Sequence, residues 1–112
     1  MARPRRHADE SRDAFYALAD PNRRRALELL ATGEKCVQDL ADHFPVSLAA
    51  VSQHLQVLHA AGLVQRREAG RRRLYAIDRS GIASVHSWLE DLARFWGEAF
   101  DRLERHLDDD TR

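Results

Sequence analysis

The eighteen residues from Pro45 to Gly62, PVSLAAVSQHLQVLHAAG, decide how this 112-residue chain folds. Pro45 breaks the helical pattern before it, Ser47 is a good N-cap because its hydroxyl can accept a backbone N–H of the first turn, and Gly62 supplies a C-terminal stop. Between these signals, apolar residues recur at helical spacing along one face: Leu48, Val51, Leu55 and Leu58. The stretch therefore predicts a helix over residues 47–61 whose opposite face is narrow and uncharged.

The face of this helix that turns away from its leucines carries small or uncharged side chains. Together with a bordering histidine, they are Ser47, Ala49, Ala50, Ser52, Gln53, His54 and Gln56. A glutamine such as Gln53 can pair with N6 and N7 of adenine, an alanine can touch a thymine methyl group, and a serine can hydrogen-bond a phosphate or a base. His54 suits half-buried packing equally well, and Gln56 suits simple solvation. The composition of this face indicates a helix that can approach the base edges of DNA closely.

Three helices are predicted ahead of this segment. The first begins near Ser11 and closes at Asp20, which can cap a second helix that has Pro21 in its first turn and stops at Gly33. A third, short helix follows. Their apolar stripes are Ala14, Phe15, Ala17 and Leu18, then Ala26, Leu27, Leu29 and Leu30, then Val37, Leu40, Ala41 and Phe44. A tight turn joins the third helix to residues 47–61, as in a helix-turn-helix.

Beyond the helix predicted over residues 47–61, the pattern of apolar residues changes from helical spacing to the alternation that is typical of strands. Residues 63–77 are predicted to form two strands joined by a turn at Ala69-Gly70-Arg71. This hairpin, the wing, carries one acid, Glu68, against five arginines: Arg66, Arg67, Arg71, Arg72 and Arg73. Because a hairpin needs no such charge bias to fold, we expect the wing to lie along a DNA backbone or to reach the adjacent minor groove. A merely solvated hairpin surface is the alternative.

A long amphipathic helix is predicted over residues 82–107. Its apolar residues are spaced by alternating fours and threes, as in a heptad seam: Val85, Leu89, Leu92, Trp96, Ala99 and Leu103. Trp88, Phe95 and Phe100 widen the apolar surface beyond what a lone helix in a chain this small can hide internally. The excess predicts a partner subunit, so we expect this helix to dimerise the chain.

The composition fits one small domain over residues 11–112, preceded by a mobile basic arm at residues 1–10. The formal net charge is zero, but 13 basic and 9 acidic residues lie in residues 1–77, whereas 5 basic and 9 acidic residues lie in residues 78–112. Seventeen of the 18 cations are arginine, whose planar fork of donors suits phosphates and guanine edges. The concentration of arginine in the first 77 residues predicts double-stranded DNA as the partner. Since no apolar stretch suits a membrane span or a secretory leader, we also expect a cytoplasmic protein.

The order of these elements and several of their residues resemble the ArsR/SmtB family of bacterial winged helix-turn-helix repressors. The segments that carry the resemblance are FYALADPNRR (15–24), LA (40–41), VSQHLQVL (51–58), AGLV (61–64) and GRR (70–72), followed by Tyr75. The resemblance implies a mainly helical fold in the order α-α-α-α-β-β-α, and a homodimeric repressor that binds a palindromic operator. It also implies that the helix over residues 47–61 lies in the major groove of DNA as the recognition helix. The first and last helices are then expected to build the dimer, so that Phe15 and Leu18 join the apolar residues of the last helix at the interface.

Metal sites known in that family are not expected here. One of them uses two closely spaced cysteines in the helix before the recognition helix, where this chain has Cys36 and then Gln38. Another pairs Asp-x-His early in the last helix with His and Glu later in that helix of the partner. Here SVH (84–86) replaces the first element, and the later positions fall at about Gly97 and Phe100. The tail with its tryptophans resembles a subgroup of the family that lacks metal sites.

The remaining chemistry-bearing residues predict no enzyme and no cofactor. Helical pairs with ligand-like spacing, such as His86 with Glu90, are common by chance and fall short of the three or four ligands that zinc needs. Neither a glycine-rich phosphate loop nor a Ser-His-Asp or Cys-His set is suggested by a local motif. Cys36, the single cysteine, is either a redox-responsive thiol or a small packing residue at a helix start. A winged helix that binds another protein is the alternative function, and the sequence does not identify an inducing signal.

Overall fold

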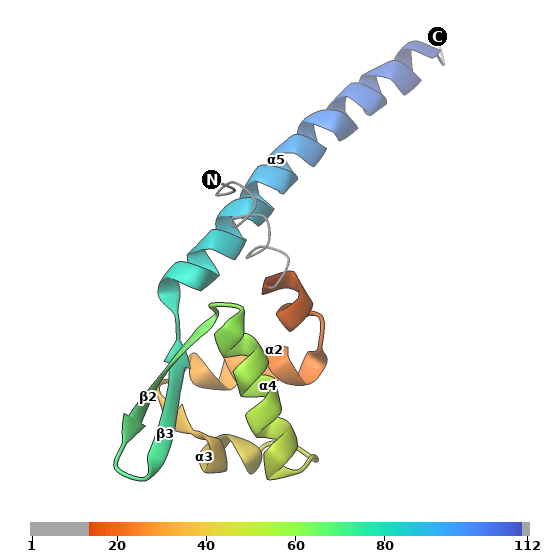
Figure 1. The fold of residues 1–112 in the computed structure, drawn as a ribbon. Coiled ribbons are helices and arrows are strands. Elements are labelled where there is room, and N and C mark those ends of the chain that lie inside the picture. The colour runs from red at the N-terminus through yellow and green to blue at the C-terminus, as the bar shows by residue number, and fades with distance from the viewer. Residues whose placement is uncertain (1–13, 111–112) are drawn as a thin grey trace, which may run out of the picture.

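The computed structural model describes residues 14–110, so the arm predicted at residues 1–10 lies outside the described residues. The chain is mainly helical, with one small antiparallel sheet (Figure 1). A first helical stretch at residues 14–18 precedes α2 (Pro21–Leu30), β1 (Lys35–Cys36), α3 (Val37–Ala41), α4 (Leu48–Ala60), β2 (Val64–Ala69), β3 (Arg72–Ile77) and α5 (Arg79–Asp110). Apart from β1, this is the predicted order of helices and strands.

Two helix starts follow the capping signals in the sequence. Asp20 accepts the backbone N–H of Arg23 at 3.1 Å, and Pro21 opens α2. At the start of α4, Oγ of Ser47 accepts the backbone N–H of Ala50 at 3.1 Å. Each cap supplies an acceptor to a backbone donor that the helix itself leaves without a partner. Both predicted starts are confirmed.

The sheet has three strands rather than the two that the sequence predicted. β1 pairs with β3 in the order β1-β3-β2, with Lys35 opposite Tyr75 and Cys36 opposite Leu74. A strand of two residues cannot show the alternation by which strands are recognised in a sequence, so β1 gave no signal. The predicted order α-α-α-α-β-β-α is therefore corrected by one additional strand before α3.

Two helices differ in length from their predictions. α3 ends before Phe44, which lies in the segment that leads to α4. α5 begins three residues earlier than the predicted 82–107 and ends three residues later. Its start is fixed by Asp78, whose Oδ1 accepts the backbone N–H groups of Ser80 at 3.0 Å and Gly81 at 3.3 Å. The cap therefore lies four residues before Ile82, the first apolar residue that marked the helix in the sequence.

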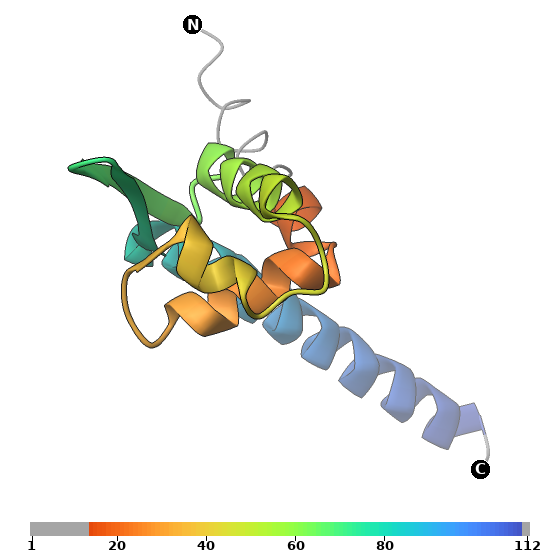
Figure 2. The ribbon, with the colours of Figure 1, turned by 90° about the horizontal axis from the view of Figure 1, so that it is seen from below.

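The core lies where α2, α3 and α4 pack against one another and against the sheet. Its buried side chains are Ala14, Ala17, Ala26, Leu30, Cys36, Leu40, Val51, Leu55, Leu58, Leu63, Val64 and Tyr75. Three of the four residues predicted for the apolar face of α4 are among them. The fourth, Leu48, is 48% exposed because it lies in the first turn of α4, at the side that faces the wing. Figure 2 shows the helices of this head, which we define as residues 14–78, with the hairpin extending from one side.

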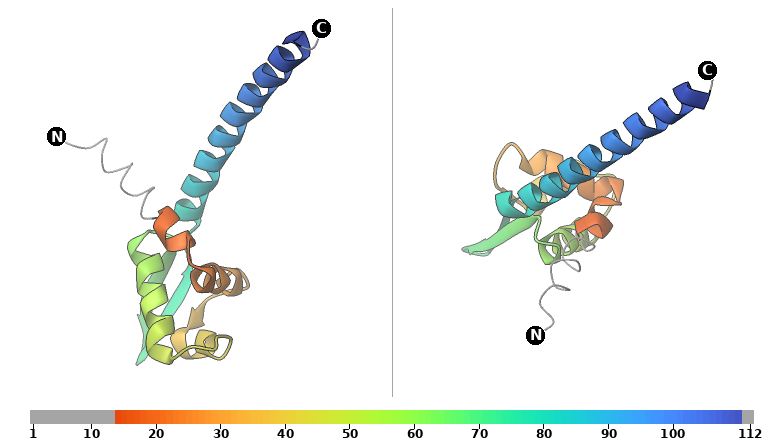
Figure 3. Two further views of the ribbon diagram at one scale, coloured as in Figure 1. Left: turned by 90° about the vertical axis from the view of Figure 1, so that its right-hand side faces the viewer. Right: turned by 90° about the horizontal axis from the view of Figure 1, so that it is seen from above.

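α5 leaves the head as a single long rod (Figures 1 and 3). Ile82 and Val85, near its start, pack against the core, and Trp88 contacts Phe15 of the first helical stretch. Beyond Trp88 the helix points away from the head (Figure 3). The protomer is consequently elongated, with principal extents of 70 × 41 × 21 Å. Among the residues that the structure describes, none of the helices combines the length and apolarity that crossing a lipid bilayer requires.

Candidate nucleic-acid interface

The outer face of α4 carries the side chains that were predicted to read bases. The exposed ones are Ser47, Ala49, Gln53 and Gln56. The partly buried ones are Ala50, Ser52 and His54. On the opposite face Val51, Leu55 and Leu58 are buried and hold α4 in the core. The fold therefore presents these small and uncharged side chains on a helix whose orientation is fixed by packing.

His54 turns one side of its ring toward the start of α2. Its Nδ1 is buried, has no hydrogen-bond partner among the described residues, and lies 3.9 Å from Oδ2 of Asp20. Partial desolvation raises the pKa of Asp20, but the backbone N–H of Arg23 and the neighbouring side chains of His54 and Arg23 lower it by more, so the net pKa lies below its ordinary value. The Nδ1 side of His54 therefore faces the protein and not a partner.

A groove brings α4 and the wing together. It encloses about 450 Å³ and is lined by Val37 and Gln38 of α3, by Leu48, Ala49 and Ser52 of α4, and by Glu68, Arg71, Arg72 and Arg73 of the wing. Side chains predicted for base reading and side chains predicted for phosphates thus line one surface. The sequence-based prediction missed Val37 and Gln38 as site residues. The only available signal was the uncharged amide of Gln38 at the start of the first helix of the helix-turn-helix.

The wing arginines separate into two groups. Nε of Arg73 donates to Glu68 at 3.2 Å, and Nε and Nη2 of Arg67 donate to the two carboxylate oxygens of Glu34 at 2.8 Å each. Within residues 14–109 the other three form no ion pair: Arg66, Arg71 and Arg72. These three exposed cations are available to an anionic partner without first breaking a contact inside the protein.

The bidentate pair of Glu34 and Arg67 shifts the pKa of both members. The hydrogen bonds and the charge of the Arg67 guanidinium hold the pKa of Glu34 below its ordinary value, although slight desolvation acts the other way. The same hydrogen bonds and the carboxylate charge raise the pKa of Arg67. Both groups are therefore ionised at neutral pH, and the hydrogen bonds between them are charge-assisted.

The predicted dimer residues fall into an exposed group and a partly buried group. The exposed ones, all on α5, are Trp88, Leu89, Phe95, Trp96, Phe100 and Leu103, and Leu107 extends the row. The partly buried ones are Phe15, Leu18, Val85 and Leu92. The ring of Trp96 contacts the rings of Phe95 and Phe100, with centroids 5.6 and 5.7 Å apart. The described protomer thus leaves a continuous apolar surface uncovered along α5.

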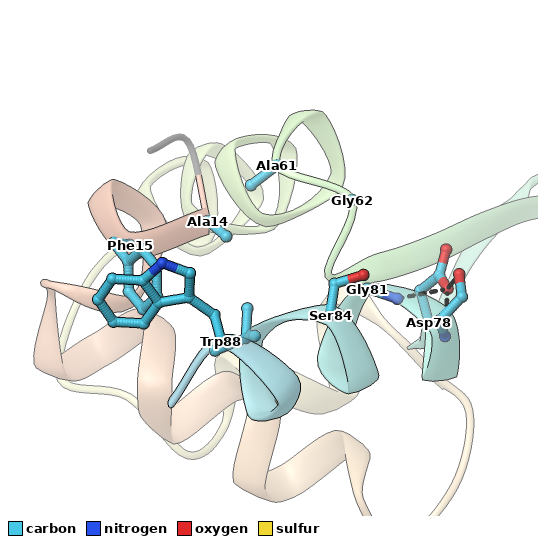
Figure 4. Close-up of a pocket in the computed structure, with 10 residues that line it drawn as sticks. Ala14, Phe15, Ala61, Gly62, Asp78, Gly81, Ser84 and Trp88 are labelled. Carbon is cyan, nitrogen blue, oxygen red and sulfur yellow. Dashed lines mark hydrogen bonds between the residues drawn. The ribbon is translucent and has the colours of Figure 1, made fainter. Parts of the chain in front are cut away.

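A pocket of about 270 Å³ lies where α5 leaves the head (Figure 4). Phe15 and Trp88 form an aromatic wall, with ring centroids 4.9 Å apart. Toward the other end of the pocket Gly81 lies directly against the backbone of Gly62. A Cβ at position 81 would fall 2.8 Å from the Gly62 carbonyl carbon and nearer still to its oxygen. The junction between α5 and the end of α4 is therefore a contact of backbone against backbone.

Cys36 is fully buried at the start of α3. It occupies the N-cap position, but its side chain makes no capping hydrogen bond. Burial supports the packing interpretation, because reactive thiols are generally solvent-accessible, and a redox role for Cys36 stays a prediction. On α5, Nδ1 of His86 lies 3.7 Å from Oε1 of Glu90. Within residues 14–109 no group of three or more His, Cys, Asp or Glu side chains is arranged to hold a metal ion.

These features define a class of protein. α3 and α4 form a helix-turn-helix, and the hairpin of β2 and β3 extends beside it as a wing. The uncharged outer face of α4 and the cationic tip of the wing line one groove. This is the winged helix-turn-helix arrangement of DNA-binding transcriptional regulators.

The chain belongs to the arsR family of bacterial regulatory proteins, whose family model matches residues 20–66. The HTH-type transcriptional regulator Rv2034 of Mycobacterium tuberculosis is 46% identical over 101 residues, which cover 88% of this chain and 92% of that protein. The transcriptional repressor SmtB homolog of Synechocystis sp. is 37% identical over 84 residues, which cover 75% of this chain and 64% of that protein. The solution structure of a homodimeric winged helix-turn-helix DNA-binding domain, Mb0332 from Mycobacterium bovis, is 31% identical, with a TM-score of 0.67 over 84% of this chain and 87% of that one. The resemblance stated from the sequence is confirmed, and the chain is a transcriptional regulator rather than an enzyme.

Proposed function

We propose that this chain is a homodimeric repressor that binds a palindromic operator. The α4 helix of each protomer would lie in the major groove, and each wing along the backbone or in the adjacent minor groove. The observation that carries the proposal is the shared groove, which is lined by the first turns of α4 on one side and by Arg71, Arg72 and Arg73 on the other. A single duplex seated there meets base-reading and phosphate-binding side chains together.

Base reading falls to the outer face of α4. Gln53, which is exposed in the middle of the helix, matches the donor and acceptor of an adenine edge, and Ala49 can meet a thymine methyl group. Ser52 lines the groove beside them. Ser47 uses its oxygen as the helix cap, so its hydroxyl proton remains for a phosphate or a base. The other candidates on this face are Ala50, His54 and Gln56.

Phosphate binding falls to the wing. Arg66, Arg71 and Arg72 carry charges that no acid of the described residues neutralises, whereas Arg73 shares its charge with Glu68. Cations that neutralise phosphates release counterions, so affinity falls with salt, and each contact contributes about one unit to the slope of log K against log salt. The wing therefore supplies affinity for any duplex, and α4 supplies the choice of sequence.

Dimerisation falls to α5 and the first helical stretch. Trp96 is 48% exposed and Phe100 57% exposed in the protomer, and such large contiguous apolar surfaces are usual for interfaces and rare on monomers. In the proposed dimer the two α4 helices would have to lie about one DNA turn, ~34 Å, apart, as a palindrome requires. The structural relative Mb0332 is described as homodimeric.

Repression follows if the operator overlaps a promoter, because the bound dimer then blocks access of RNA polymerase. The SmtB homolog of Synechocystis is named a repressor, which supports this direction of control. Binding to promoter DNA places the protein in the bacterial cytoplasm. The gene of the regulator itself is a natural target, so we also propose that the chain controls its own expression.

The test is the binding of the purified protein to a duplex taken from directly upstream of its own coding sequence. A random duplex of equal length is the control, both are titrated by fluorescence anisotropy across a salt series, and sedimentation gives the oligomeric state. We expect a dimer that prefers the upstream duplex and loses affinity steeply with salt. A monomer at working concentration, or no DNA binding at any salt, refutes the proposal and favours a winged helix that binds another protein.

A further inference from the structure

One wing arginine is held by an acid from a distant part of the chain. Arg67 on β2 donates two parallel hydrogen bonds of 2.8 Å to Glu34, which precedes it by 33 residues. Side-chain exposure is 60% for Arg67 and 34% for Glu34. A bidentate fork fixes the relative direction of its two partners as well as their distance. The pair can therefore orient the segments that carry it.

The pair spans the sheet across its central strand. Arg67 lies opposite Leu74 of β3, and Leu74 lies opposite Cys36 of β1. Glu34 comes directly before β1, and β1 leads without a break into α3, the first helix of the helix-turn-helix. The ion pair thus ties the outer strand of the wing to the segment that opens the helix-turn-helix, while β3 lies between them (Figure 1).

The pair also lies away from the groove proposed for DNA. Successive side chains of a strand point to opposite faces, and Glu68, the neighbour of Arg67, lines the groove beside α4. Arg67 therefore points to the other face of the hairpin. Glu34 lines a different hollow there, between α2 and β3, together with Leu27 and Ala76. Neither member of the pair lines the groove.

We propose that Arg67 is a positioning residue rather than a phosphate contact. Its ion pair with Glu34 sets the angle of the wing against α3 and α4, so that the arginines at the wing tip meet the backbone of the duplex that α4 reads. This role rests on the proposed function, because the angle matters only if wing and helix engage one duplex. Glu34 would be expected to repel DNA, because its carboxylate is an anion. By holding Arg67 and thereby the wing, it instead raises the affinity for DNA.

The sign of that effect separates positioning from simple competition. If Glu34 merely competed with phosphates for Arg67, its neutralisation would free a cation and tighten DNA binding. If the pair positions the wing, neutralisation weakens binding, because the wing tip loses its fixed angle. Glu28→Gln is the matched control, since Glu28 pairs with Arg25 at 3.3 Å on α2 and its replacement changes the net charge equally.

For Glu34→Gln we expect the Kd for the upstream duplex to rise by roughly threefold to tenfold, with the salt slope unchanged, since exposed pairs contribute modestly and each dimer contains two. Glu28→Gln should stay within about twofold of the parent. Arg67→Gln should match Glu34→Gln in both Kd and slope, whereas Arg71→Gln should lower the slope by about one for each wing. Tighter binding by Glu34→Gln, or a slope loss in Arg67→Gln equal to that of Arg71→Gln, overturns the proposal.

A charge reversal and a DNA-free measurement complete the test. Glu34→Arg combined with Arg67→Glu restores an ion pair with the charges exchanged, so binding should recover most of what Arg67→Glu alone loses. In the free protein, amide hydrogen exchange of β2 and β3 should be faster in Glu34→Gln than in the parent or in Glu28→Gln. If the parent binds no DNA but this exchange difference appears, the proposed function fails, and only the restraint of the wing by the ion pair stands. If the parent binds DNA and Glu34→Gln changes neither exchange nor Kd, the positioning role of Arg67 fails and the proposed function stands.

Discussion

Two glycines of α5 should respond oppositely to the same substitution. Gly81 lies at the start of the helix against the backbone of Gly62, whereas nothing lies within 4 Å of a Cβ built on Gly97. Gly97 is also not part of the heptad seam, although its neighbour in the sequence, Trp96, is. Replacing each glycine by alanine therefore tests whether the contact between α5 and the end of α4 is as close as the structure has it.

The magnitude follows from the geometry at position 81. An added Cβ would lie 2.8 Å from the Gly62 carbonyl carbon and much nearer to its oxygen, whereas ordinary contacts begin near 3.4 Å, so the backbone must move by well over half an ångström. Overpacking of this kind costs about 1–3 kcal/mol, and the gain from replacing a helical glycine offsets only about 0.5–1 kcal/mol of that. We expect Gly81→Ala to lose about 1–2 kcal/mol of unfolding free energy and Gly97→Ala to gain about 0.5–1 kcal/mol.

Urea unfolding followed by circular dichroism measures both variants. All samples must have the same protomer concentration, because association stabilises the folded state by mass action. The parent and the two variants should unfold in the order Gly81→Ala, parent, Gly97→Ala as the urea concentration rises. A Gly81→Ala protein that is as stable as Gly97→Ala would show that α5 does not rest on Gly62, and the reasoning would be refuted.

Three further predictions concern DNA, assembly and pH. Gln53→Ala should lower the preference for the upstream duplex over random DNA, whereas Arg71→Ala should weaken both, and an equal loss of both by Gln53→Ala in anisotropy titrations would contradict its base-reading role. Trp96→Ala should raise the dimer dissociation constant at least about thirtyfold in sedimentation equilibrium, because exposed tryptophans on apolar surfaces are typical interface anchors, and an unchanged dimer would exclude this face. Asp78→Ala should cost about 1 kcal/mol at neutral pH through loss of the α5 cap. Because the Ser80 hydroxyl and backbone N–H groups hold the pKa of Asp78 below its ordinary 3.8, that difference should persist above pH 3.8 and vanish only as the pH falls through the folded-state pKa, and a difference already lost at pH 5 would contradict the assignment.

Local signals in the sequence predicted most of the fold. Asp20 and Ser47 are caps whose hydrogen bonds join residues three apart, so the sequence contains both partners of each bond within one helical turn. The heptad spacing of α5 and the alternation of the wing are equally local. β1 was not predicted, because Lys35 and Cys36 form a strand only through pairing with β3, which lies about forty residues further along the chain.

The candidate site was predicted less completely than the fold, for the same reason. The residue types on α4 and on the wing could be chosen from their chemistry, but which arginines are engaged with acids depends on contacts between distant segments. Glu34 and Arg67 meet because β1 and β2 flank the same strand, and no spacing in the sequence shows this. Leu48 was predicted for the core from its place on the helical wheel, yet in the first turn of α4 this side chain faces the open groove beside the wing and stays exposed.

The contact of Gly81 with Gly62 has a consequence for the direction in which α5 leaves the head. α5 has 32 residues and is therefore ~48 Å long, so a rotation of about 5° at its base would move its far end by some 4 Å relative to the head. Because Gly81 has no side chain, the contact between the two backbones itself sets the angle between α5 and the head. If two copies associate through α5, as we propose, this contact between Gly81 and Gly62 helps to set how the two heads are oriented relative to each other.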